Sequence, residues 1–133
     1  MKKRLTLIQM DVHVNDVEYN YNRVQELLTQ SLSESPDIIV LPETWNTGFY
    51  PSKELINIAD RNGERTKSLL SAFAKEHNVN IVGGSVAVAK NDVVFNTSYI
   101  YNRKGKLVGE YSKMHGFSPA KEDYYFAGGT HTT

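Results

Sequence analysis

The chain has 133 residues, and its 15 basic and 15 acidic side chains give a formal net charge of zero. A neutral chain has no overall field that would draw it to nucleic acid or to an anionic membrane surface. Hydrophobic residues make up 40% and charged residues 23%, the composition of one ordinary globular domain. No apolar run approaches the roughly 20 residues of a membrane-spanning helix. We therefore expect a cytoplasmic globular domain with neither a nucleic acid nor a membrane as partner.

The sequence gives little support for a metal or an organic cofactor. It contains no cysteine, which excludes disulfides and thiolate metal sites and leaves no thiol nucleophile within these residues. The four histidines show no spacing typical of a metal site. The pairs Gly83-Gly84 and Gly128-Gly129 are too sparse for a phosphate-binding loop. We expect no metal and no cofactor.

The first part of the chain reads as strand, helix, strand. Residues 4–11 alternate with apolar side chains in both sets, which is typical of a strand covered on both faces. Asn15 or Asp16 can cap a helix whose apolar residues recur every three or four positions. Residues 37–41 form a short apolar run between two prolines, which predicts a buried strand.

The remaining elements are shorter or less regular. In chain order we expect a helical turn at 53–58, a helix at 64–77, and strands at 80–89, 93–101 and 106–111. Residues 90–92 predict a tight hairpin between the first two of these strands. Beyond Tyr111 the periodicity fades, and the rest of the chain reads as a long loop that returns to no element. We therefore expect an α/β domain over residues 1–133 that is incomplete at its C-terminus.

Two charged residues follow predicted strands directly. Glu43 comes after the buried strand, between a rigid proline and Trp45, where partial desolvation would suit a general base. Lys113 follows the last strand, where an ammonium group can stabilise an oxyanion. His115, two residues later, fits either a proton shuttle or a structural hydrogen-bonding residue. From position alone, an ordinary surface residue is the favoured explanation for both the glutamate and the lysine, by roughly four to one.

The order of short motifs along the chain indicates more than any single residue does. The segments that carry it are Leu41-Pro42-Glu43, Gly48-Phe49-Tyr50, Val82-Gly83-Gly84-Ser85, Phe95-Asn96-Thr97-Ser98 and Tyr111-Ser112-Lys113-Met114-His115-Gly116-Phe117. Taken together they resemble the nitrilase superfamily of carbon–nitrogen hydrolases, and look nearest to its ω-amidases and 2-oxoglutaramate amidases. The resemblance implies the first half of a four-layer α-β-β-α sandwich.

The resemblance also implies a catalytic set. Glu43 would be the general base, Lys113 would hold the oxyanion of the tetrahedral intermediates, and Glu122 would be the family's second glutamate. The nucleophile would be a cysteine, which in this family follows the lysine in a strand-to-helix turn. Because these residues include no cysteine, we expect the nucleophile to lie beyond this chain and the chain alone to be inactive.

Further residues match positions near the substrate in that family. Trp45 and Tyr50 are expected to line the acyl pocket, with His115 as a third substrate-binding residue. Asn96 is expected to fix backbone rather than to touch substrate, and Gly116 replaces the leucine common in the lysine motif. The implied substrate is a small amide or nitrile, and the full-length protein is expected to be a homodimer. Two alternatives stay open: a non-catalytic truncated remnant or split-gene interaction module, and the glutaminase domain of a larger synthetase.

Overall fold

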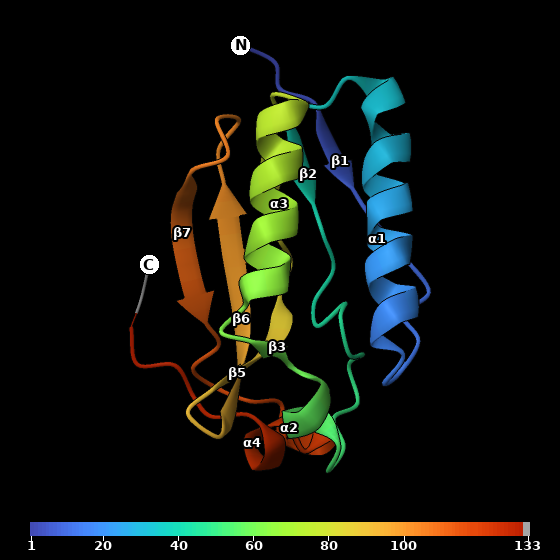
Figure 1. The fold of residues 1–133 in the computed structure, drawn as a ribbon. Coiled ribbons are helices and arrows are strands. Elements are labelled where there is room, and N and C mark those ends of the chain that lie inside the picture. Colours follow the sequence, from blue (N-terminus) through green and yellow to red (C-terminus); the bar gives the residue numbers. More distant parts are fainter. Residues whose placement is uncertain (132–133) are drawn as a thin grey trace.

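The computed structural model describes residues 1–131, which form one seven-stranded mixed sheet with its two long helices on one face (Figure 1). The strands lie in the order β1-β2-β4-β6-β5-β3, and β7 pairs with the free edge of β6. Their bounds are β1 Leu5–Leu7, β2 Ile38–Val40, β3 Asp60–Arg61, β4 Asn80–Val82, β5 Val86–Lys90, β6 Val93–Tyr101 and β7 Leu107–Ser112. β1, β2 and β4 are parallel, whereas β6 runs antiparallel to β4, β5 and β7.

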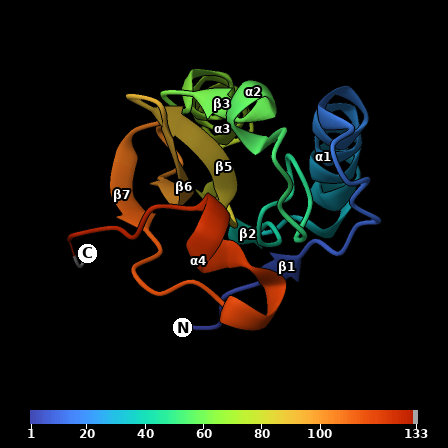
Figure 2. The same cartoon turned by 90° about the horizontal axis from the view of Figure 1, so that it is seen from below.

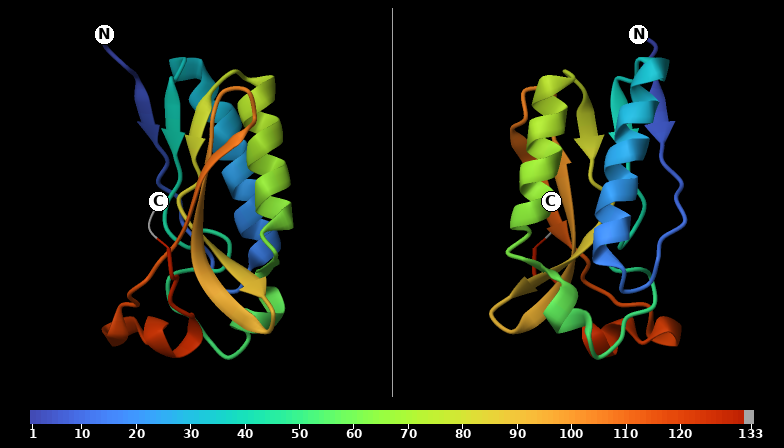
Figure 3. Two further views of the ribbon diagram at one scale, coloured as in Figure 1. Left: turned by 90° about the vertical axis from the view of Figure 1, so that its left-hand side faces the viewer. Right: turned by 45° about the vertical axis from the view of Figure 1, so that its right-hand side comes forward.

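Helix α1 spans Val17–Ser31 and α3 spans Glu64–Glu76; both cover the same face of the sheet (Figures 1 and 3). The predicted cap is confirmed, since the Asp16 carboxylate accepts a hydrogen bond from the Tyr19 backbone N–H at 3.1 Å. The apolar stripe of α1 packs into the main core with side chains of β2 and β4. The fully buried members of this core include Val24, Leu28, Leu70, Ile39 and Ile81.

Among residues 1–131, no helix covers the opposite face of the sheet (Figure 3). A row of apolar residues lies on this face. Register places Leu7 beside Val40, Val40 beside Val82, and Val82 beside Ile100, so one row crosses four strands. Leu7 is 69% exposed, and the other three side chains are only half-buried. The expectation that the first strand is covered on both faces is therefore wrong for residues 1–131.

Two boundaries differ from the sequence expectation. The strand expected at 80–89 is two strands, β4 and β5, interrupted at Gly83, Gly84 and Ser85; both pair with the same edge of β6, opposite β7. The loop expected after Tyr111 contains the 3₁₀ helix η2, Ser118–Ala120, and helix α4, Glu122–Tyr125. The short turn near 53–58 is α2, Leu55–Ile58, and the end of α1 continues as the 3₁₀ helix η1, Leu32–Glu34.

The hairpin expected at residues 90–92 is confirmed. Lys90 of β5 pairs with Val93 of β6, so Asn91 and Asp92 alone form the turn. Both have positive φ, 48° and 64°, as the two central residues of a type I′ turn require.

A tight backbone contact shapes the turn after β2. Thr44 has a φ of +45°, which is rare for a β-branched residue, and its backbone N–H donates to Ser85 Oγ at 3.0 Å. Gly84 has a φ of +61°, and a Cβ atom there would lie 1.9 Å from the carbonyl oxygen of Pro42. The strained turn therefore depends on a residue without a side chain at position 84.

Replacing Gly84 by alanine is expected to lower the free energy of unfolding by more than about 2 kcal/mol, because it combines an unfavourable φ with a backbone clash. Denaturant unfolding measures this. Gly109→Ala is the matched control, since its Cβ would meet only the Ile100 side chain, at 3.1 Å. Equal stability of the two variants would contradict the dependence of the turn on Gly84.

Candidate active site

Three strand ends meet at one end of the sheet, the lower end in Figure 1. β2 and β7 finish there, and β6 starts there because it runs antiparallel to β7. Glu43 follows β2, and Lys113 follows β7. The Lys113 backbone N–H donates to the carbonyl of Asn96 at 2.8 Å, which extends the β6–β7 ladder by one residue. Topology alone therefore brings Glu43, Lys113 and Asn96 to the same end of the sheet.

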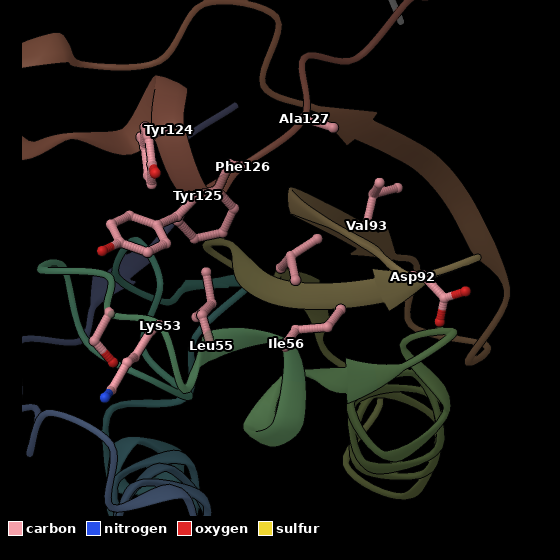
Figure 4. Close-up of a pocket in the computed structure, with 11 residues that line it drawn as sticks. Lys53, Leu55, Ile56, Asp92, Val93, Tyr124, Tyr125, Phe126 and Ala127 are labelled. Atoms are coloured by element: carbon pink, nitrogen blue, oxygen red, sulfur yellow. The ribbon is translucent and has the colours of Figure 1, made fainter.

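Helix α4 lies beneath this end of the sheet and faces the viewer in Figure 2. It carries Glu122 at its first position. Tyr125 and Phe126 pack against a second buried cluster that includes Leu55. Figure 4 shows these two aromatic side chains near Leu55. Together with Val93 they line a hollow of about 420 Å³. This packing anchors a helix that is too short to be stable alone, and so places Glu122.

One ammonium group lies between two carboxylates. Lys113 Nζ is 2.9 Å from Glu43 Oε1 and 2.8 Å from Glu122 Oε2. The side chain of Glu122 is almost completely buried, at 1% exposure, whereas that of Glu43 is 45% exposed. Glu122 also accepts a 2.6 Å hydrogen bond from the Phe117 backbone N–H. Its carboxylate thus joins the lysine to the loop that precedes α4.

The charges of this cluster support one another. Burial alone would raise the pKa of Glu122, but the Lys113 ammonium, the Phe117 N–H and the Asn96 amide together hold that pKa below its usual value. Burial likewise lowers the pKa of Lys113, and hydrogen bonds from its ammonium to the two glutamates raise that pKa by more. Both residues are therefore ionised at neutral pH.

The hydrogen-bond donors and acceptors that the cluster leaves unused determine what it can do chemically. An ammonium group has three N–H donors, and two of those on Lys113 are used by the glutamates. The third is available to an anionic oxygen. Glu43 is the more exposed carboxylate and can accept a proton from a group that approaches from outside. The arrangement therefore suits acyl transfer, with a proton acceptor beside an oxyanion donor.

Comparison with known proteins shows the family of this chain. A family model described as carbon-nitrogen hydrolase matches residues 4–133. The chain belongs to the carbon–nitrogen hydrolase family. A 2-oxoglutaramate amidase of Bacillus subtilis is 38% identical over 130 residues, which are 98% of this chain and 49% of that protein. An omega-amidase of Saccharomyces cerevisiae is 29% identical over 125 residues, covering 87% of this chain and 42% of that protein.

Solved structures confirm the predicted α/β fold of this hydrolase family. A CN-hydrolase superfamily protein of Xanthomonas campestris has a TM-score of 0.83 at 29% identity, over 97% of this chain and 47% of that one. An amidase of Nesterenkonia has a TM-score of 0.81 at 18% identity, over 97% and 49%. The chain thus spans about half the length of the relatives it matches.

The other residues expected at the site do not join the cluster. Trp45 is fully buried, its indole N–H donates to the Gly83 carbonyl at 3.0 Å, and its ring packs edge-on against Tyr21. The expectation that Trp45 lines an acyl pocket is therefore corrected. Its side chain points into the core and packs under the turn that follows β2. Tyr50 is 68% exposed and contacts Phe49 edge-on at 5.4 Å. His115 is exposed and has no hydrogen bond or ion pair among residues 1–131.

Gly116, the departure from the lysine motif, has a clear structural role in this chain. A Cβ atom there would lie 2.7 Å from the backbone nitrogen of Asp123. The missing side chain therefore lets the loop pass directly against the start of α4, next to Glu122. In the part of the chain that the structure describes, no group of three or more acidic or histidine side chains could hold a metal ion. Within residues 1–131, no helix has the length and apolar character needed to cross a membrane.

The charge of Glu122 should stabilise the fold in a pH-dependent way. Because its native pKa is lowered, its contribution is present above the ordinary pKa of 4.5 and is lost as the pH falls through the native pKa. The Glu122→Gln variant is therefore expected to have a free energy of unfolding about 1 to 3 kcal/mol lower than the parent at pH 7, with a progressively smaller difference at acidic pH. Denaturant unfolding at several pH values measures the difference. A loss that is constant from pH 7 to pH 3 would contradict the ionised pairing with Lys113.

Proposed function

We propose that this chain supplies the base and the oxyanion-binding lysine of an amidase that hydrolyses small ω-amides. The observation that carries the proposal is the single ammonium group of Lys113 between Glu43 and Glu122. Its nucleophile is a cysteine thiol from residues outside this sequence, since the 133 residues contain none. On this proposal, the chain alone has no amidase activity.

In the proposed reaction, Glu43 takes the proton of the thiol as sulfur attacks the carbonyl carbon. The oxyanion that forms accepts a hydrogen bond from the free N–H of Lys113. Glu43 then returns the proton to the leaving nitrogen as the carbon–nitrogen bond breaks, which releases ammonia and leaves a thioester. Water attacks the thioester, Glu43 accepts its proton, and the carboxylic acid product and the thiol are restored.

Glu122 has a different part in this proposal. It is almost fully buried, and Lys113 and backbone and amide N–H groups hold it, so it does not exchange protons with substrate. Its charge instead keeps the lysine protonated and pointed at the reacting carbonyl. The preference for ω-amides rests on the similarity to a 2-oxoglutaramate amidase and an omega-amidase. A homodimer, a cytoplasmic location and substrate contacts of Tyr50 and His115 stay predictions.

Replacing Glu43 by glutamine in the full-length protein is expected to lower kcat for ammonia release from 2-oxoglutaramate by roughly 10²- to 10⁴-fold, because glutamine cannot accept the thiol proton. Glutamate dehydrogenase-coupled detection of ammonia measures the rate. Glu54→Gln, an exposed glutamate before α2, is the matched control and should keep the parent rate. Normal turnover of Glu43→Gln would remove the proposed base.

Lys113→Met tests the oxyanion donor separately. Loss of the ammonium is expected to lower kcat by roughly 10²- to 10³-fold, the usual cost of removing one oxyanion donor. Lys90→Met is the control, because Lys90 also pairs with a glutamate, Glu110 at 3.0 Å, on another part of the sheet. If both variants lose activity equally, the effect comes from general destabilisation and the assignment of Lys113 fails.

A further inference from the structure

One amide side chain bridges the two glutamates of the cluster. Asn96 Nδ2 lies 3.0 Å from Glu43 Oε1 and 3.2 Å from Glu122 Oε1, so each of its two hydrogens points to a different carboxylate. Asn96 is 3% exposed and lies near the start of β6. The amide and the ammonium of Lys113 thus bind the same pair of carboxylates.

The orientation of this amide follows from its neighbours. Its Oδ1 is buried and has no hydrogen-bond partner among the described residues. Rotating the amide by half a turn would place Oδ1 against two carboxylate oxygens and lose both hydrogen bonds. The two N–H···O contacts therefore fix the side chain, although an acceptor is left unpaired.

The two carboxylate oxygens of Glu43 have different surroundings. Oε1 accepts from both Lys113 Nζ and Asn96 Nδ2. Oε2 has no hydrogen-bond donor within residues 1–131, and the side chain is 45% exposed. The carboxylate is consequently held by one oxygen and presents the other outward.

We propose that Asn96 is a positioning residue that, together with Lys113, holds Oε1 of Glu43 and Oε1 of Glu122 so that Oε2 of Glu43 is the atom that accepts the proton. The part of this inference that concerns proton transfer rests on the proposed amidase function. Asn96 itself touches no reacting atom: it acts through the two glutamates.

Charge balance explains why a second donor is needed. Two carboxylates around one ammonium leave an excess negative charge in a partly buried site, and like charges this close favour protonation of one of them. The two amide hydrogens offset that repulsion without adding a charge. Asp123, the next acidic residue, accepts a hydrogen bond from Ser118 Oγ at 3.1 Å and, within residues 1–131, none from Lys113 or Asn96. The charged groups that face Glu122 are therefore Lys113 and Glu43.

The first test measures the pKa of Glu122 directly, by carboxyl ¹³C NMR titration of the full-length protein. Asn96→Ala is expected to raise that pKa by roughly one unit, because a hydrogen bond to the charged form is lost. Asn57→Ala is the matched control, since Asn57 donates to a glutamate, Glu54 at 3.4 Å, on the exposed surface. An unchanged pKa of Glu122 in Asn96→Ala would overturn the proposal.

A second variant keeps the test decisive if Asn96→Ala does not fold. Asn96→Ser retains a short donor that can serve one carboxylate at a time, so a smaller rise in the pKa of Glu122 is expected. If Asn96→Ser folds and leaves this pKa at the parent value, the bridging role is wrong.

Steady-state kinetics distinguish a positioning role of Asn96 from an effect on stability alone. Asn96→Ala is expected to lower kcat roughly ten- to hundredfold with little change in KM, and Asn96→Ser to recover part of kcat. A raised Glu122 pKa with unchanged kcat would refute the orienting effect on Glu43. If the parent protein releases no ammonia from any ω-amide, the proposed function fails, and the NMR titration still decides whether Asn96 bridges the carboxylates.

Discussion

The ammonium of Lys113 between two carboxylates is the constraint on which the rest of this site depends. Each partner comes from a different segment: the turn after β2, the end of β7 and the start of α4. Because water is partly excluded there, the charges need hydrogen-bond partners from the protein, and the nearby backbone supplies one of them. Phe117 donates its N–H to Glu122, and Gly116 lets the loop approach α4 closely enough for this contact. The cluster therefore links three segments that lie far apart in the sequence.

Much of the fold could be predicted because local sequence determines it. The cap at Asp16, the apolar stripe of α1 and the two-residue turn at Asn91-Asp92 each depend on neighbours a few positions away. The division of residues 80–89 could not be predicted in this way. Apolar residues continue on both sides of Gly83-Gly84, and the break arises because Gly84 packs against the carbonyl of Pro42, far away in sequence. Helix α4 was missed because four residues carry no periodicity.

The candidate site shows the same division. The resemblance carried by the order of motifs indicated Glu43, Lys113 and Glu122, and in the structure both glutamates contact Lys113. The resemblance to the family implied that Trp45 lines a pocket, yet Thr44, at φ +45°, turns the chain so that the indole points into the core. The role of Asn96 depends on the register between β6 and β7. A single polar residue within a strand does not reveal which groups it faces.

The apolar row of Leu7, Val40, Val82 and Ile100 has a consequence for how such a domain gains its stability. A four-layer α-β-β-α sandwich places a second sheet against a face of this kind. Where a second sheet docks on this row, its burial would contribute free energy only in the assembled state, so that folding of this sheet and docking of the second would be thermodynamically linked. Glu43 follows β2, the strand that carries Val40. Cooperative assembly of two such layers would therefore order the carboxylate of Glu43 in the same step that buries the apolar row.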